Sequence, residues 1–444
     1  MTPRTKTAAP TYEKGYVADA APDGWVNWDP FEKTPELQWP ACVPIYSRME
    51  REDGRVSSVL QAIALPIQRT PWRIDPNGAE DDVVDFVSRN MNLPIVGQDA
   101  IENPSRTRDR FSWAEHLRTA LTMLQYGHSV CEQVYRRGDD GRFWIRKLAP
   151  RPQRTISAFN VALDGGLNSI TQLAPASNGK IIYGVQPLEI SINRLVVYAR
   201  DMEPGRWYGK SLLRPSYKHW LLKDELMRIE AAGARRNAIG LAVGTAANPD
   251  DPEEVKAMQR LASSTRAGMN SGVGLANGQT LDLKGVQGNL PDIRAAIEYH
   301  DKQIALAGLA HFLNLDGKGG SYALASVQQD TFTQSTQSTG EVIRDVATAH
   351  IVEDLVDINF GISVGAPRIV FDEIGSRQDA TAAALKMLVE AGLLSPDVLI
   401  ERTVRQKLGL PSKPAETPEP APQDAPLPPV KAARTPSKQL ELQW

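Results

Sequence analysis

Apolar positions in the first half of the chain follow helical spacing and then the alternation of strands. From Tyr46 the spacing predicts a helix that Pro66 interrupts, and its apolar face consists of Val56, Val59, Leu60 and Ile63. The segment 70–76 predicts a short strand, and 111–127 predicts a second helix that stops at Gly127.

Short segments rich in β-branched and aromatic residues follow, with Asp-Gly, Gly-Gly or Asn-Gly turns between them. These segments are 128–137, 143–150, 155–161, 169–175, 180–185 and 193–200. The pattern predicts an antiparallel sheet, so residues 46–206 are expected to form one α+β unit. Residues 1–45 hold scattered Pro and Trp without a sustained period, which suggests an extended arm.

Two long helices are predicted on either side of a small insert. Residues 211–237 place Leu222, Leu226 and Ile229 on one stripe, and this helix is expected to end near Gly240. The second helix, which opens at Pro291, places Ile293, Ile297 and Ile304 on one face. The insert between them is interpreted as a strand at 239–244, a helix at 250–265 and a hairpin at 273–286.

A third and longer helix is predicted after a glycine-rich loop, because 322–361 contains no proline. About 35 helical residues would span about 50 Å. Gln, Ser and Thr fill its first half, whereas a wide apolar stripe marks its second half: Ile343, Ala347, Ile351, Leu355 and Ile358. A strand at 366–374, short helices at 379–392 and 395–409, and a Pro-rich tail predicted to be disordered complete the chain.

Composition narrows the class of protein. The chain has 444 residues, 41% hydrophobic and 23% charged, and a formal net charge of −3. That charge argues against a protein that grips nucleic acid through many phosphate contacts, so any contact with DNA should be loose. Cys42 and Cys131 lie far apart, which predicts neither a disulfide framework nor a zinc site and favours a reducing compartment. No apolar stretch approaches the roughly 18 residues of a membrane span, and the N-terminus lacks a signal-peptide core, so we expect neither export nor membrane insertion.

Candidate chemistry is sparse. The loop Gly317-Lys318-Gly319-Gly320-Ser321 has the glycines of a phosphate cradle, but it joins two helices and lacks Ser or Thr directly after the lysine. We therefore interpret it as a helix–helix connector. The histidines show no metal-binding spacing, and Asp372 and Glu373 lie on opposite faces of a strand, where they cannot act together as acid and base. No catalytic residue, metal or cofactor is predicted.

The helix that begins near residue 208 is the most basic element of the chain. Its basic residues are Lys218, Lys223, Arg228, Arg235 and Arg236, and Lys210 precedes them. For any one of these residues a solvated helix face is the default interpretation. Repeated around a ring, however, the same charges would be multiplied.

The order of these elements resembles that of tailed-bacteriophage portal proteins, in particular that of the Mu-type branch. The resemblance covers residues 46–410 and is carried by these segments: REDGRVSSVLQAIALPIQRTPWRI, LQYGHSVCEQVYR, WYGKSLLRPSYKHWLLKDELMRIEAAGARRNAIGLAVG, DGKGGSYALASVQQDTF, and IVEDLVDINFG followed by APRIVFDEI. The order and spacing of these segments, rather than any single one, make the similarity.

The resemblance implies an elongated α+β ring subunit with named parts. They are an N-terminal arm (1–45), wing (46–206), first stem helix (207–236), clip (237–290), second stem helix (291–313), tunnel loop (314–323), spine helix and wing strand (324–374), crown helices (375–410) and disordered tail (411–444). In the tunnel loop, Lys318, Ser321 and Tyr322 would line a constriction beside Gly317, Gly319 and Gly320. Lys218, Lys223, Arg228, Arg235 and Arg236 would be the DNA-facing stem residues.

The function implied is that of a non-enzymatic dodecameric ring at one capsid vertex. Such a ring conducts double-stranded DNA without sequence preference during packaging and ejection. Its partners would be the terminase large subunit, the head–tail adaptor and the major capsid or scaffold protein, and its location the virion, with the host cytoplasm during assembly. Two alternatives stay open on the sequence: a nuclease or phosphoesterase-type enzyme, and an oligomeric scaffold that never contacts DNA.

Overall fold

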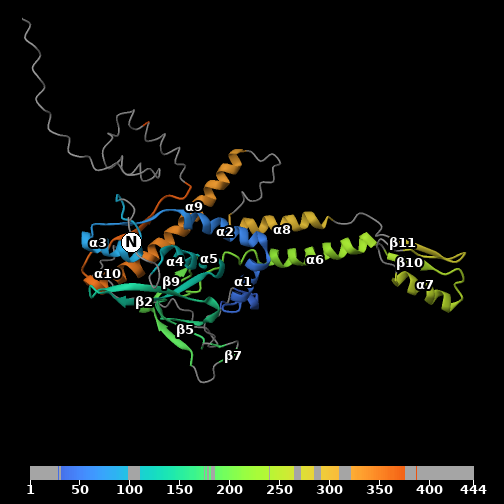
Figure 1. The fold of residues 1–444 in the computed structure, drawn as a ribbon, viewed down its shortest axis with the longest axis horizontal. Coiled ribbons are helices and arrows are strands. Elements are labelled where there is room, and N and C mark those ends of the chain that lie inside the picture. The colour runs from blue at the N-terminus through green and yellow to red at the C-terminus, as the bar shows by residue number, and fades with distance from the viewer. Residues whose placement is uncertain are drawn as a thin grey trace, which may run out of the picture. The chain divides into compact units, whose positions relative to one another are not determined.

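The structure is a computed structural model that describes residues 29, 32–98, 111–174, 176–177, 180–181, 186–239, 241–264, 272–284, 292–309, 322–375 and 387. The chain divides into two units, 1–376 and 377–444. Of the second unit only Met387 is described, in a helical conformation, so the predicted crown helices and Pro-rich tail lie outside the described residues. Figure 1 shows the first unit as an α+β body from which a pair of helices extends.

The body opens with η1 (Pro35–Leu37), α1 (Cys42–Glu52) and α2 (Gly54–Arg69). The break between the two α-helices falls at Asp53, whose side chain caps α2 by accepting the N–H groups of Arg55 and Val56. Pro66 does not interrupt this helix, contrary to the prediction. The Thr70 N–H donates to the Pro66 carbonyl at 3.0 Å, so the helix continues past the proline, and buried Ile63 and Ile67 on either side hold this turn on the core.

A helix that sequence analysis missed, α3 (Asp81–Met91), packs near β1 (Trp72–Asp75). The predicted strands at 70–76 and 366–374 are confirmed as β1 and β12 (Arg368–Phe371), which pair antiparallel. The helix predicted over 111–127 is divided into α4 (Trp113–Ala120) and α5 (Met123–Tyr126). Gly127 ends it as predicted, with φ 90° and the Tyr208 carbonyl so close that a Cβ would lie 2.6 Å from its oxygen.

The strand segments form two three-stranded sheets and a small hairpin rather than one sheet. The first sheet has the order β3 (Phe143–Arg151), β2 (His128–Arg137), β9 (Leu195–Ala199), and the second has β4 (Ile156–Val161), β5 (Leu167–Gln172), β8 (Leu188–Ser191). The hairpin is β6 (Ala176–Ser177) with β7 (Lys180–Ile181), and short 3₁₀ turns lie at η2 (Gln153–Thr155) and η3 (Ile192–Arg194). All of these pairings are antiparallel, as predicted, but β8 was missed. The turn at η2 separates β3 from β4 and divides the expected sheet.

The paired helices and their insert follow the predicted order. They are α6 (Tyr217–Ile239), β10 (Leu241–Thr245), α7 (Pro252–Ser264), β11 (Thr280–Lys284) and α8 (Ile293–Ala307). The hairpin predicted within 273–286 is wrong, because β11 pairs antiparallel with β10 and not with 273–276. The strand partner therefore lies on the other side of α7 in the sequence.

The third long helix runs as α9 (Tyr322–Ala347), a π-helical turn η5 (Thr348–Val352) and α10 (Glu353–Phe360). The predicted apolar stripe is confirmed at Ile343, Ala347, Ile351 and Leu355, which are buried in the core. Ile358, by contrast, is 48% exposed. This core includes α2, α3, α4 and the first sheet, whereas a second core joins α1, the second sheet and the start of α6.

Candidate functional site at the base of the paired helices

Helices α6 and α8 run side by side, and their near ends meet the body at α1 and α2 (Figure 1). The chain turns repeatedly up to Ser216, so α6 begins at Tyr217, later than residue 211, where the helical pattern predicts it, and residue 207, which the resemblance implies. The Asp292 side chain caps α8 by accepting the Ala295 N–H at 3.0 Å. Ile297 and Ile304 are buried, which confirms the apolar face predicted for this helix.

An ion cluster joins α2, α6 and α8 at this base. Lys223 Nζ lies 3.1 and 3.0 Å from the two carboxylate oxygens of Asp53 and 2.6 Å from Asp301 Oδ1. The side chains of Lys223 and Asp53 are only 12% and 5% exposed. Because buried charges need partners, these three side chains hold one another in place.

Two histidines meet in the same region, one from each helix. His219 Nδ1 lies 3.0 Å from His300 Nδ1, and the ring centroids are 5.2 Å apart. Burial lowers the pKa of His219, and the positive charges of Lys218 and His300 lower it further. The sequence shows no metal-binding spacing for these two residues, because they lie 81 positions apart in the chain.

The basic residues predicted to face DNA do not share one environment. Lys218 is exposed on α6, and Arg228 is 73% exposed while it pairs with Asp224 at 2.8 Å. Lys223 differs from that expectation, since two carboxylates already neutralise it. Arg235 and Arg236 belong to α6, but their side chains lie outside the described residues.

Apolar side chains are exposed along both helices. On α6 they are Leu221, Leu222, Met227 and Ile229, between 43% and 51% exposed, and on α8 they are Tyr299 and Leu306, 54% and 40% exposed. Of the stripe predicted from Leu222, Leu226 and Ile229, therefore, Leu222 and Ile229 are exposed in this chain, whereas Leu226 is half-buried. Each of the two helices packs one face against the other helix and leaves apolar side chains exposed on the rest of its surface.

The insert between the helices packs α7 against β10. Met258 of α7 is buried, and a Cβ at Gly244 would lie 2.9 Å from its carbonyl oxygen. Glycine at this position thus permits the close approach of helix and strand. The apolar side chains of Leu283, Val255 and Leu275 are exposed around this small core.

The predicted tunnel loop falls almost wholly outside the described residues. Gly317, Lys318, Gly319, Gly320 and Ser321 are not described, and Tyr322 is the first residue of α9. Their role stays a prediction. The described ends of the segment are Leu309, just after α8, and Tyr322.

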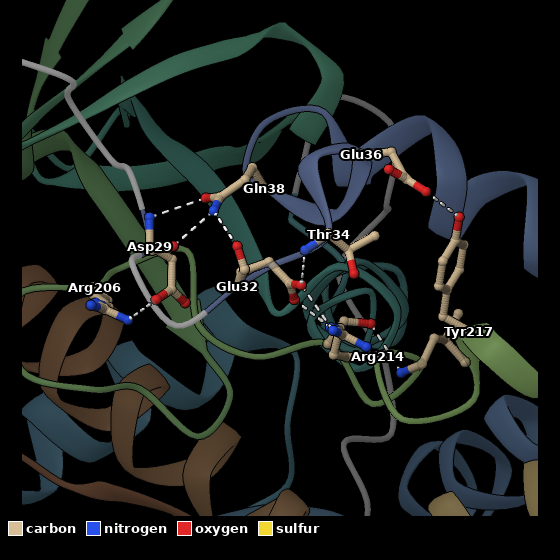
Figure 2. A network of polar contacts seen from close by, with 10 residues as sticks. Asp29, Glu32, Thr34, Glu36, Gln38, Arg206, Arg214 and Tyr217 are labelled. Atoms are coloured by element: carbon tan, nitrogen blue, oxygen red, sulfur yellow. Dashed lines mark hydrogen bonds and ion pairs between the residues drawn. The ribbon is translucent and has the colours of Figure 1, made fainter.

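A polar network near the N-terminus reaches the first turn of α6 (Figure 2). We call its four N-terminal members, Asp29, Glu32, Glu36 and Gln38, the N-terminal clasp. The buried Gln38 amide donates to the backbone carbonyls of Asp29 and Glu32, each at 2.7 Å, and accepts the Asp29 N–H at 3.0 Å. These bonds fold the segment onto itself.

The N-terminal clasp holds the entry to α6 through three contacts. Glu32 receives two hydrogen bonds from the Arg214 guanidinium, Asp29 pairs with Arg206 at 2.8 Å, and the Tyr217 hydroxyl donates to Glu36 at 2.9 Å. Burial raises the pKa of Glu32, but the Arg214 and Thr34 hydrogen bonds outweigh it, so that the pKa lies below 4.5. The sequence does not reveal this site, because its partners are about 180 positions apart and follow no periodicity.

The described residues offer little for catalysis. No group of three or more His, Cys, Asp or Glu within them could hold a metal ion. Burial lowers the pKa of His116 to about 3 and that of His128 to about 4, and raises the pKa of Cys131 to about 12. All three are therefore uncharged near neutral pH. None of the described helices has the length and apolar character that a membrane span requires.

Comparison with known proteins gives one family. A family model described as the portal protein of Mu bacteriophage matches residues 43–410. No curated protein matches the chain.

The chain is also similar to several solved structures. A chain of the virion of a native gene transfer agent particle is 15% identical, with TM-score 0.52, and the match covers 84% of this chain and 94% of that one. A chain from the neck of a native gene transfer agent particle, computed with C12 symmetry, is also 15% identical, with TM-score 0.53 and coverage of 89% and 98%. An HK97 family phage portal protein from Corynebacterium diphtheriae is 16% identical, with TM-score 0.41 and coverage of 75% and 94%.

Proposed function

Because the chain belongs to the portal protein family of Mu bacteriophage, we propose that it forms a ring at one capsid vertex through which DNA passes during packaging and ejection. The α+β fold expected from the sequence is confirmed. Portal proteins are structural proteins, so the alternative of a nuclease or phosphoesterase is wrong for this chain.

The exposed apolar surface of the paired helices is the observation that supports a ring most directly. A head-to-tail assembly needs two different surfaces on each subunit, and it closes into a ring when the rotation between subunits permits. We place the Leu222 and Ile229 face of α6 against the Tyr299 and Leu306 face of α8 in the next subunit. About half of each of these side chains is exposed in the single chain.

Twelve subunits are the proposed number, since the similar neck chain belongs to a particle computed with C12 symmetry. We place Arg228 and Arg235, which share one side of α6, toward the channel and assign Lys223 to the ion cluster. Helical spacing puts Lys218 and Arg236 on the side of Leu222 and Ile229, at the proposed subunit interface. Residues 317–322 would form the constriction. A conduit for DNA of any sequence gains nothing from tight phosphate binding, which agrees with the net charge of −3.

The remaining partners follow from the same proposal. A ring at a capsid vertex must meet the capsid or scaffold protein around it, the terminase large subunit during packaging and the head–tail adaptor afterwards. The protein would therefore be located in the virion, and in the host cytoplasm during assembly.

The test is the assembly state of the purified full chain, measured by negative-stain electron microscopy and native mass spectrometry. We expect rings with a central hole. The double variant Leu222→Glu with Ile229→Glu should be monomeric, because each contact between α6 and the α8 of the next subunit would bury two introduced carboxylates without partners, at a high desolvation cost. Leu173→Glu, at a leucine that is 52% exposed next to β5, is the matched control and should still form rings.

Three outcomes would contradict the proposal or part of it. A monodisperse monomer or dimer of the unaltered chain would remove the ring itself. Rings that persist in the double variant would show that the α6 surface is not a subunit interface. A ring that never admits DNA would instead favour the oligomeric scaffold.

A further inference from the structure

His219 and His300 form a pair of imidazoles that the portal function does not require. The two residues come from different helices, and their Nδ1 atoms face each other at 3.0 Å. Both side chains are half-buried, so their nitrogen atoms are held in place while solvent still reaches the pair. Imidazole nitrogen is a preferred ligand of zinc, nickel and copper ions.

The separation of the nitrogen atoms agrees with coordination of one ion. Metal–nitrogen bonds of about 2.0–2.1 Å place two ligand nitrogens about 2.9 Å apart at a right angle and about 3.4 Å apart in a tetrahedron. The observed 3.0 Å lies within that interval. We propose that His219 and His300 bind one divalent transition-metal ion of the zinc, nickel or copper class between α6 and α8.

The neighbouring charges are compatible with a bound cation. Lys223, Asp53 and Asp301 carry one positive and two negative charges, a sum of −1, and they pair with one another. Lys223 lies one helical turn after His219, and Asp301 directly follows His300. Lys218 opposes the cation, but its side chain is exposed and solvent screens its charge.

No third protein ligand is present among the described residues, so water completes the coordination. The ion would then act as a clip between two helices that also meet through the ion cluster at Lys223 and through the ion pair between Arg294 and Glu230. A clip that joins positions this distant in the chain stabilises the helix pair against separation. This inference does not depend on ring formation.

Isothermal titration calorimetry tests the proposal. Zinc chloride is titrated at pH 7.5 into the tag-free full chain, from which a chelator has first removed bound metal. We expect saturable binding of one ion per chain. His219→Ala and His300→Ala should each weaken binding at least tenfold. His350→Ala is the matched control, because His350 is an exposed histidine on another helix. This variant should bind zinc with the same affinity as the unaltered chain.

The same proteins should differ in thermal denaturation. Zinc should raise the Tm of the unaltered chain and of His350→Ala, but not that of His300→Gln, which keeps a hydrogen-bonding side chain and guards against a folding defect of the alanine variant. Absence of saturable binding would show that the pair shares only a proton. If His219→Ala and His300→Ala bound zinc with the affinity of the unaltered chain, the ion would lie elsewhere and the proposal would be overturned. The same would follow if His350→Ala lost as much affinity as they do.

Discussion

Lys223 illustrates how a residue's role depends on partners that the sequence does not display. As one basic residue in a basic helix it was predicted to face DNA. In the structure its ammonium group contacts Asp53, 170 positions earlier, and Asp301 of α8. No local pattern relates these three positions, whereas Lys218 and Arg228 keep the solvent exposure that helical spacing alone predicts.

Removing the Lys223 charge should destabilise the protein because Asp53 would remain buried without its cation. We expect Lys223→Ala to lower the free energy of unfolding by about 3 kcal/mol, the lower end for a broken buried ion pair, since Asp53 keeps its hydrogen bonds at the start of α2. Urea denaturation measures the change. Lys218→Ala, on the same helix but exposed, should stay within about 0.5 kcal/mol of the unaltered chain. Equal effects of the two substitutions would refute a special role for the ion cluster.

Elements with strong local periodicity were predictable, and elements defined by distant contacts were not. Helices α6 and α8 and the α9–α10 segment were predicted because their apolar residues recur at helical spacing. The pairing of β10 with β11 was not, since α7 separates the two strands and the nearer segment, 273–276, offered an equally simple hairpin. The division of the sheet at η2 has the same origin, because strand spacing does not reveal which strands pair.

The N-terminal clasp belongs to the same class of long-range features. Part of the expected extended arm, from Asp29 onward, is attached within its own chain to the entry of α6 (Figure 2). This attachment couples the orientation of α6 to a segment with little regular structure. A change that releases the clasp should therefore be felt in the first turn of α6.

Protonation of Glu32 should provide that change. The pKa of Glu32 in the folded chain lies below 4.5, so the carboxylate contributes stability that is present above about pH 4.5 and lost as the pH falls through the folded-state value. Glu32→Gln should behave at pH 7 as the protonated form does. Hydrogen exchange at pH 7 should then be faster in residues 32–41 and at Tyr217 in this variant.

The exposed Glu225 of α6 supplies the control, and Glu225→Gln should leave exchange unchanged. If Glu32→Gln exchanges as slowly as the unaltered chain, the ion pair between Glu32 and Arg214 is not needed to hold the N-terminal clasp on α6. The remaining contacts of the clasp would then be enough to hold it there.

At the scale of the whole molecule, family membership could be inferred because the order of elements is preserved while individual motifs are weak. The resemblance was assigned to 46–410, and the family model matches 43–410. Identities of 15% with solved structures of the same fold show how little of that order resides in particular residues. Residue roles are accordingly harder to predict than the fold: the loop at 317–321 has a predicted role that rests on its position alone.

Deletion of Gly317–Ser321 separates that role from folding. The flanking helices have their own anchors, because Ile297 and Ile304 bury α8 and Ile343 and Ile351 bury the long helix that follows. The shortened chain should therefore still form rings in electron micrographs. Particles assembled with it should package or retain less DNA than those with the unaltered chain, measured as protected DNA per particle, because the constriction proposed for the channel would be gone. Loss of rings would instead show that the loop is needed for assembly, and unchanged DNA content would show that the channel does not depend on it.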